Sequence, residues 1–149
     1  MNDNEQNKMA FGAAVMAAAT GTDDIEILRS DAVNPPGLPF SDGVRIGRLV
    51  ILSGMLGIRP HTLELALGGL EGQTRQTLEN LRSVLAAHGM TLRDVVRVQV
   101  MLADIADWPR FNDVYREYFS EPYPARSAFG TSGLALGARV EVEAFAVKR

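Results

Sequence analysis

The sequence predicts an α+β protein in which a mixed β-sheet is covered on one face by two helices. Two longer segments have the three- and four-residue spacing of apolar residues that is typical of amphipathic helices. Short apolar segments typical of strands lie before, between and after them. The 149-residue chain is long enough to bury a sizeable core without a metal or a disulfide. It has no cysteine, which excludes a disulfide framework, a Cys-ligated zinc, an iron–sulfur cluster and a thiol nucleophile.

The N-terminal residues 1–24 are expected to be a disordered extension, and residues 25–149 are expected to form a single domain. The apolar segment 9–19 has the length and the small-residue ending of a signal peptide core. Asp3 and Glu5 precede it, whereas a secretory signal begins with a positively charged region. We therefore expect a cytoplasmic protein, with a signal segment as the alternative.

The first half of the domain predicts strands joined by tight connections. Residues 25–28 form a short apolar stretch, and residues 34–39 are too rich in Pro and Gly for anything but a loop. Two aliphatic segments, 44–46 and 49–52, flank Gly47-Arg48 with the spacing of a hairpin.

The first helix is predicted from Leu70 to a stop at Gly89. Its apolar stripe consists of Leu70, Thr74, Thr77, Leu78, Leu81, Val84 and Leu85. The opposite face, which includes Gln73 and Arg75, is expected to be solvated.

A buried-face alternation at Val96, Val98, Val100 and Leu102 predicts the next strand. The second helix is expected to have Asp107 as its N-terminal cap and Pro109 in its first turn. Its aromatic stripe is Trp108, Phe111, Tyr115 and Tyr118, and it ends before Pro122 and Pro124.

The last strand alternates the small apolar residues Val140, Val142, Ala144 and Ala146 with residues that include Glu141 and Glu143. Two helices cover only one face of such a sheet. The apolar side chains of the other face must meet something apolar, and the usual answer is a second copy of the chain. We therefore expect a homo-oligomer.

Composition and motifs exclude several functions. Residues 31–149 carry equal numbers of acidic and basic residues without a run of basic ones, so nucleic acid is not an expected partner. No apolar segment approaches the length of a membrane span. His61 and His88 lie far apart without acidic residues at ligand spacing, so both are expected to be solvated and no metal site is expected. Motifs for a catalytic Ser triad and for nucleotide binding do not occur either.

Three charged residues remain as candidates for chemistry: Arg126, at the start of a strand after Pro124, and the two carboxylates Glu141 and Glu143. The guanidinium of Arg126 is able to hold a ligand carboxylate through two parallel hydrogen bonds. The alternative is an ordinary ion pair between Arg126 and one of these carboxylates on the sheet. The residues alone leave both readings open.

At these residues the sequence resembles the Rid family (RidA/YjgF) of enamine/imine deaminases. The resemblance runs from about Asn34 to Arg149, and six motifs occur in the family's order and with nearly its spacing. They are the Pro-rich loop, Leu52-Ser53-Gly54, the segment 73–81 (QTRQTLENL) with Asp94-Val95-Val96, Phe111-Asn112-Asp113-Val114-Tyr115, Pro124-Ala125-Arg126-Ser127 and Glu141-Val142-Glu143-Ala144.

The resemblance implies a chorismate-mutase-like fold, assembled as a homotrimer with a barrel-like centre and active sites in the clefts between subunits. It implies hydrolysis of reactive 2-imino acids, such as 2-iminobutanoate and 2-iminopropanoate, to 2-keto acids and ammonia. The substrate would be a small molecule, and no cofactor would be needed.

The resemblance also implies roles for individual residues. Arg126 would bind the substrate carboxylate and so orient C2 for attack. Glu141 would position the attacking water as a general base, and Glu143 is the matched control. The residues that would line the substrate cleft are Phe40, Ser53, Gly54, Asn112 and Ala128.

Three positions depart from the family pattern. Ala128 stands where many members have Cys, Phe40 where many have Tyr, and Met55 where Gln is commoner. Loss of a polar contact changes selectivity strongly, so these positions bear on which substrate is preferred. The alternatives are a non-catalytic protein that binds 2-keto acids and a pathway-specific hydrolase of aminoacrylate type. Ribonuclease activity fits the balanced charge poorly.

Overall fold

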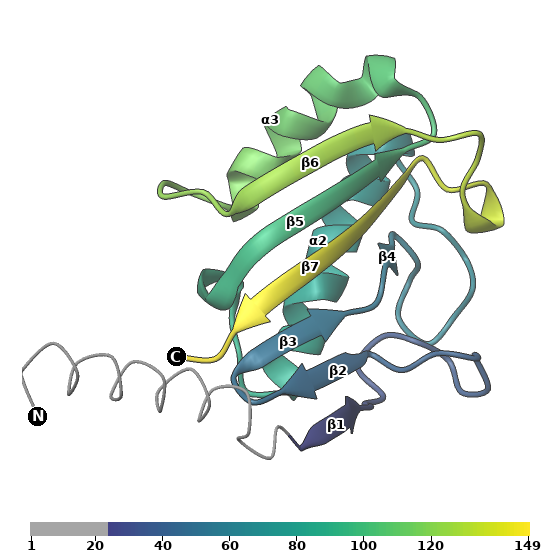
Figure 1. Cartoon of the computed structure of the whole chain (residues 1–149). Helices are drawn as coiled ribbons and strands as arrows, with labels where there is room; N and C mark the ends of the chain where they lie inside the picture. Colours follow the sequence, from purple (N-terminus) through teal and green to yellow (C-terminus); the bar gives the residue numbers. More distant parts are fainter. Residues whose placement is uncertain (1–23) are drawn as a thin grey trace, which may run out of the picture.

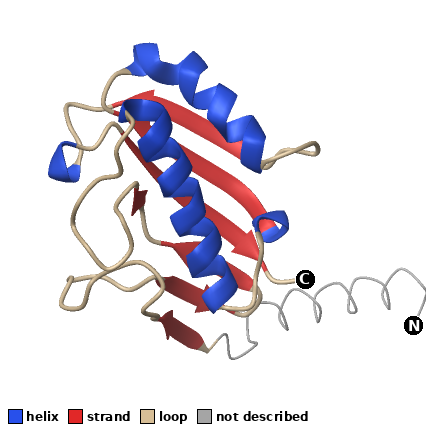
Figure 2. Ribbon diagram, turned by 180° about the vertical axis from the view of Figure 1, so that it is seen from behind, coloured by secondary structure: helices blue, strands red, loops and turns tan. Residues whose placement is uncertain are grey.

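The computed structural model of the chain describes residues 24–149 (Figure 1). The expected N-terminal extension and the alternative of a signal segment lie outside these residues, Asp24 excepted. The described part contains one mixed sheet, and the two long helices cover one of its faces (Figure 2). The predicted α+β architecture is therefore confirmed.

The sheet has seven strands with the order β1-β2-β3-β7-β5-β6, and β4 also pairs with β7. All neighbours are antiparallel except β5 and β6, which run parallel. The strands are β1 (Ile25–Leu28), β2 (Gly43–Ile46), β3 (Leu49–Leu52), β4 (Met55–Leu56), β5 (Val95–Leu102), β6 (Ala125–Gly130) and β7 (Val140–Val147). The last strand of the chain therefore lies at the centre of the sheet.

The helices are α2 (Gly69–Ala87) and α3 (Trp108–Tyr118), with short 3-10 turns η1 (Leu92–Asp94), η2 (Ile105–Asp107) and η3 (Ala135–Gly137). The predicted stop of α2 is confirmed: Gly89 has φ +73°, and the N–H of Met90 donates back to the carbonyl of Leu85. The predicted apolar stripe of α2 is buried throughout.

The core lies between the sheet and the helices. Val140, Val142, Ala144 and Ala146 of β7 are all fully buried, whereas the alternate residues of that strand are only half-buried. The predicted alternation in the last strand is confirmed. It gives the sheet one face against the helices and one face open.

The predicted alternation of buried residues in β5 is wrong at its first position. Val96 is 42% exposed, and Val95 is buried in its place. The register with β7 shifts between Val95 and Arg97, which marks a β-bulge. Because a bulge inserts one extra residue, it changes the face on which the residues before it lie.

Two polar residues around Arg139 also differ from expectation. Gln73, expected to be solvated, is buried, and its side-chain oxygen accepts from the Arg139 N–H at 2.8 Å. Asp107 makes no side-chain cap; its carboxylate instead accepts from the guanidinium groups of Arg139 (2.8 Å) and Arg110 (3.1 Å). Because Arg139 directly precedes β7, these bonds tie both helices to the start of the central strand.

His61 is exposed as expected, but the expectation that His88 is solvated is wrong. The ring of His88 is largely buried, and its Nε2 lies 3.0 Å from Asp42 Oδ2. The hydroxyl of Ser30 donates to the same carboxylate oxygen. The three side chains connect the end of α2 to the segments on both sides of the Pro-rich loop.

Asn80 offers a test of how α2 is attached to the sheet. Its side-chain amide donates to the carbonyls of Leu56 (2.9 Å) and Ile58 (2.8 Å). Replacement by Ala leaves both carbonyls without this donor, so Asn80→Ala is expected to lower the free energy of unfolding by about 2–3 kcal/mol. The measurement is urea denaturation at one protein concentration.

Gln76→Ala is the matched control, since Gln76 donates only to the Asn80 side chain and is half-exposed. It is expected to cost less than about 1 kcal/mol. Equal losses in the two variants would contradict the role given to Asn80.

Candidate functional site

The candidate residues lie on opposite faces of the sheet. Arg126 pairs with Val98 in the β5–β6 register, and Val98 is fully buried beneath the helices. Glu141 pairs with Met101 on the β5–β7 side, one residue out of phase with the buried positions. Since strand side chains alternate between faces, Arg126 points toward α3 and Glu141 toward the open face.

The guanidinium of Arg126 is held by groups of α3. Its Nη2 donates to Asn112 Oδ1 at 2.6 Å. Its central carbon lies 4.7 Å from the ring centroid of Tyr115, 5.6 Å from that of Phe111 and 5.9 Å from that of Trp108. These are cation–π distances, so three aromatic rings and one amide determine the position of the charge.

A cavity of about 250 Å³ opens beside Arg126, lined by Trp108, Asn112, Tyr115, Tyr123 and their neighbours. Burial lowers the pKa of Arg126, and the nearby charge of Arg116 lowers it further while Tyr115 opposes the change. Burial also raises the pKa of Tyr115 to about 12. The guanidinium of Arg126 thus faces the cavity as a cation, and it has N–H groups that are not bonded to Asn112. Such a group suits a ligand carboxylate.

Glu141 lines a second and larger cavity of about 560 Å³. Phe40, Ser53 and Gly54 line the same cavity, so the structure brings four of the sequence-predicted residues together. Burial raises the pKa of Glu141, and the charge of Glu143 raises it further. A carboxylate with a raised pKa is a stronger base than an ordinary one.

Gly54 lies directly against the Glu141 carboxylate. A Cβ added to Gly54 would overlap Glu141 Oε1, and it would lie only 3.0 Å from the carboxyl carbon of Glu141. These atoms form the end of a flexible side chain, so a Cβ at Gly54 would displace the carboxylate and not the backbone. The glycine is not needed for a turn, since its φ is not in the left-handed region. The absence of a side chain at Gly54 thus leaves room for the carboxylate in this position.

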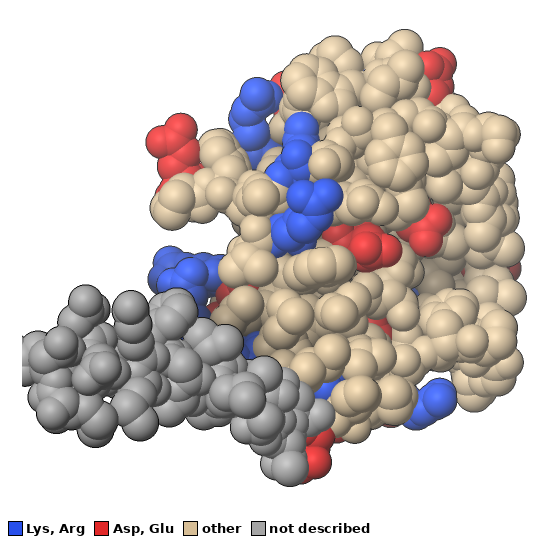
Figure 3. All heavy atoms as spheres, in the orientation of Figure 1, with Lys and Arg blue, Asp and Glu red and all other residues tan. Residues whose placement is uncertain are grey.

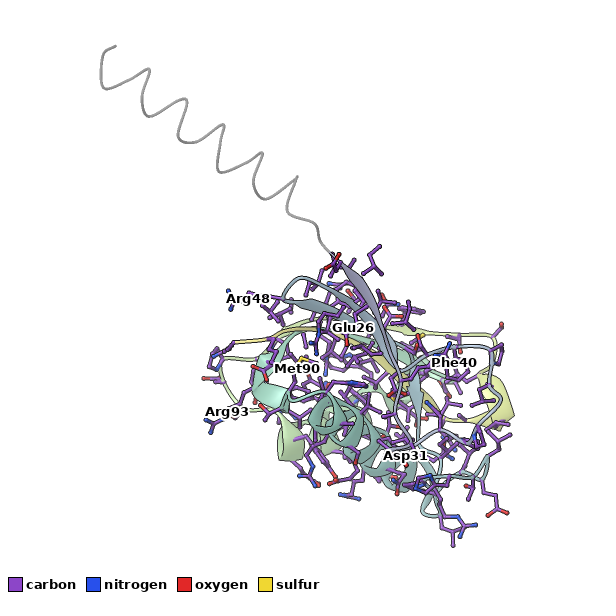
Figure 4. The ribbon with its side chains drawn as sticks, turned by 90° about the horizontal axis from the view of Figure 1, so that it is seen from below. Glu26, Asp31, Phe40, Arg48, Met90 and Arg93 are labelled. Atoms are coloured by element: carbon purple, nitrogen blue, oxygen red, sulfur yellow. The ribbon has the colours of Figure 1, made fainter. Side chains whose placement is uncertain are left out.

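Ser53 and Phe40 belong to adjoining segments of the larger cavity. The hydroxyl of Ser53 donates to the carbonyl of Ser41 at 2.6 Å, and its N–H donates to the carbonyl of Asp42 at 2.8 Å. Ser53 thus holds the segment that carries Phe40. Figure 4 shows Phe40 at the end of the molecule opposite Arg48 and Met90.

Ala128 lines neither of these two cavities. It is half-buried against the core, where it pairs with Val100. Its strand, β6, is the edge of the sheet within one chain, so half of the main-chain groups along it face away from β5.

The ion-pair reading of Arg126 is wrong for a single chain. Within residues 24–149, Arg126 forms no salt bridge with Glu141 or Glu143, and it bonds to Asn112 instead. The physical reason is the alternation of the strands, which places the cation and the carboxylates on different faces.

The sequence-based prediction missed Trp108, Tyr115 and Tyr123 as site residues. The sequence places Trp108 and Tyr115 in the aromatic stripe of the second helix without a role in the site, whereas in the structure Trp108 is exposed and both residues line the Arg126 cavity. The sequence contains one signal for two of them: Trp108 lies four residues before Asn112 and Tyr115 three residues after it, so both share the helix face of this expected cleft residue.

Between residues 24 and 149, no three His, Asp or Glu side chains gather closely enough to hold a metal ion. In the same range no helix is long and apolar enough to cross a membrane.

Comparisons with known proteins identify the family. A family model described as Endoribonuclease L-PSP matches residues 31–148. A 2-iminobutanoate/2-iminopropanoate deaminase from Bos taurus is 41% identical over 110 residues, which cover 74% of this chain and 80% of the relative. The chain belongs to the Rid family. The resemblance noted in the sequence is thereby confirmed.

Solved structures of Rid proteins have the same fold. RidA from an Antarctic Psychrobacter is 35% identical with a TM-score of 0.77, covering 82% of this chain and 98% of that one. TdcF from E. coli, solved with bound serine, is 29% identical with a TM-score of 0.75, covering 83% of this chain and 99% of that one.

The contact between Gly54 and Glu141 is testable through stability. Gly54→Ala is expected to lower the free energy of unfolding by about 1 kcal/mol, because the new Cβ displaces the half-buried carboxylate at the end of the flexible Glu141 side chain. In a Glu141→Ala background the same change should cost almost nothing, since the overlapping atoms are absent. A double-mutant cycle by urea denaturation measures the difference. An equal cost in both backgrounds would contradict the contact.

Proposed function

We propose that this Rid protein hydrolyses reactive 2-imino acids, such as 2-iminobutanoate and 2-iminopropanoate, to 2-keto acids and ammonia. The observation that carries the proposal is the pair of cavities, one presenting the Arg126 cation and the other the Glu141 base, in a chain related to a deaminase of that activity. These two groups are what the reaction requires: one binds the substrate carboxylate and one activates water.

The active site is formed by two subunits of a homotrimer. Arg126 and Glu141 lie on opposite faces of one sheet, so a small substrate that meets both must meet them on different chains. The open face also carries apolar side chains such as Met101 and Phe145 that a neighbouring subunit would cover. Figure 3 shows this face, which is largely uncharged apart from basic and acidic groups beside each other near its middle.

A cyclic arrangement satisfies this geometry. In a head-to-tail ring, each chain presents its Arg126 side to one neighbour and its Glu141 side to the other. Every interface then contains one Arg126 and one Glu141, which gives three equivalent sites in a trimer.

Arg126 binds the substrate carboxylate in this mechanism. One of its nitrogens is already bonded to Asn112, and the aromatic rings of α3 hold the plane of the guanidinium. The remaining N–H groups form two parallel hydrogen bonds to the carboxylate. The substrate is then fixed at one end, and its C2 is held for attack.

Glu141 of the neighbouring subunit activates the water. As the water oxygen forms a bond to C2 of the protonated imine, the carboxylate accepts a proton from that water. The resulting carbinolamine receives the proton on nitrogen, the C–N bond breaks, and ammonia leaves with the electron pair. Loss of the hydroxyl proton then leaves the 2-keto acid. No oxidant or cofactor enters this balance.

Two features support a small amino-acid-like ligand in this family and not a nucleic acid. The related TdcF was solved with serine, which carries the same type of carboxylate as a 2-imino acid. Although the family model is described as an endoribonuclease, the larger cavity is lined by Glu141 and Glu143, whose charges repel phosphate.

Mixing two inactive variants tests the shared site. Arg126→Ala and Glu141→Gln are each expected to reduce the enzymatic rate by at least about a hundredfold, as usual for a lost binding or base group. In hybrid trimers formed from both, about a quarter of the sites join an intact Arg126 with an intact Glu141 under random mixing. Ammonia release should return to that level after the subunits are exchanged.

Arg75→Ala is the control for loss of a surface arginine, because Arg75 pairs with Glu117 on the exposed side of the helices. It should leave the rate unchanged. Failure of the mixture to recover, in trimers shown by mass to be hybrids, would mean that Arg126 and Glu141 do not act across an interface. A wild type that binds 2-keto acids without accelerating hydrolysis would favour the non-catalytic binding protein.

The pH dependence tests the role of Glu141 as base. Its pKa is raised above the ordinary 4.5, and the base must be ionised, so activity is expected to fall as the pH decreases through a value above 4.5. Glu143→Gln removes the second cause of the shift and should move this acidic limb to lower pH. Rates above spontaneous hydrolysis, measured across pH for both proteins, provide the comparison.

Glu117→Gln serves as the control, because Glu117 pairs with Arg75 on the far side of the sheet from Glu141. The rate of the Glu117→Gln variant should fall over the same acidic pH range as the rate of the wild type. If Glu143→Gln left the acidic side of the pH–rate profile unchanged, Glu141 would not be the group whose ionisation controls the rate.

A further inference from the structure

The larger cavity has an apolar wall opposite the carboxylate. Side chains from three separate segments line it, namely Leu38, Phe40, Met55, Ile58, Leu63 and Leu136. In Figure 1 the yellow loop between β6 and β7 and the loop that follows β4 lie at the same end of the sheet. At about 560 Å³ the cavity has the size of a typical small-molecule site, which an imino acid of three or four carbons would leave mostly unfilled.

Three of these side chains are unusually exposed for large apolar residues. Phe40 is 46% exposed, Leu63 is 51% exposed and Leu136 is 49% exposed. Single exposed apolar residues are common, but three that converge on one cavity indicate a surface that binds something apolar.

Leu136 has a backbone conformation that disfavours its side chain. Its φ is 62° and its ψ is 10°, in the left-handed region that glycine adopts readily and residues with a Cβ avoid. In the same loop, Gly133 and Gly137 also have positive φ and are glycines. Leu136 is half-exposed and does not belong to the core, so the fold itself gives no reason for a side chain here.

Charge at the cavity adds a second constraint. The charged residues that line it within the described chain are Glu141 and Glu143, both acidic. A ligand with a second carboxylate would be repelled, and a ligand with a polar side chain would lose hydration against the apolar wall. An uncharged apolar side chain avoids both penalties.

We propose that the preferred substrates are 2-imino acids with a bulky apolar side chain, branched or aromatic, and that Leu136 is a specificity-determining residue of the wall that contacts this side chain. This preference rests on the proposed function, since Glu141 determines where the reacting C2 lies. The substrate side chain then extends from C2 into the wall, while its carboxylate reaches Arg126 of the neighbouring subunit.

A substrate series tests the preference. Imines of alanine, leucine, phenylalanine and glutamate are generated in place by an amino-acid oxidase with peroxide removed, and the acceleration over spontaneous hydrolysis is measured. The expected kcat/KM for the leucine- or phenylalanine-derived imine is at least about tenfold above that for the alanine-derived one, with the glutamate-derived imine lowest.

Two failures are distinguishable in this series. Equal or faster hydrolysis of the alanine-derived imine would overturn the apolar preference and leave the deaminase function intact. The absence of acceleration for all four imines would overturn the proposed function and the preference with it.

Leu136→Gly tests the residue itself. The variant should lose roughly tenfold in kcat/KM for the leucine-derived imine and stay within about twofold for the alanine-derived one. Its thermal unfolding temperature should not fall, because glycine relieves the left-handed strain. The second readout separates loss of a substrate contact from loss of a folded structure.

Leu67→Ala is the matched control, since Leu67 is 92% exposed and does not line the cavity. It should change neither rate. If Leu136→Gly slowed both imines equally, or altered the mass of the assembly in solution, the wall would be a contact between copies of the chain and the proposal would be overturned.

Discussion

The strict alternation of side chains along β7 determines the arrangement of the whole site. β7 is bonded to β3, β4 and β5, so its register cannot shift without breaking the centre of the sheet. Val140 and Val142 are buried against the helices, and Glu141 between them must face the other way. Arg126, in phase with the buried positions, is directed to the helix side. One chain therefore does not by itself present both groups to the same small substrate.

The two charged groups are held by different physical means. Arg126 is held by the amide of Asn112 and by the aromatic rings of α3 at cation–π distance, which still leaves N–H donors for a ligand. The Glu141 carboxylate occupies the space beside Gly54 that a Cβ would fill, and its raised pKa comes mainly from burial. Both side chains start from strands, so the groups that would meet the substrate are positioned by the most rigid part of the fold.

The residues inferred to select the substrate side chain, in contrast, lie mainly on loops. The apolar wall comes from the Pro-rich segment, from the segment after β4 and from the loop around η3. Loops vary more easily than strands without loss of the core, so the same strand-borne chemistry is able to serve different substrates. Phe40 and Met55, two of the positions where this chain departs from the usual Rid pattern, both line that cavity.

The sequence by itself determined both long helices and most of the strands, though not the short strand β4, because apolar periods and the breaks at Gly89 and the prolines are local properties. It also named Arg126, Glu141 and Gly54 as candidate site residues through motifs that resemble those of the family. Tertiary structure decided what depends on distant partners: the bulge that exposes Val96, the burial of Gln73 under Arg139 and the pairing of His88 with Asp42. It alone decided that Arg126 and Glu141 face opposite ways. A period of two shows that a strand has two faces, but only the order and register of the strands decide which face meets the helices.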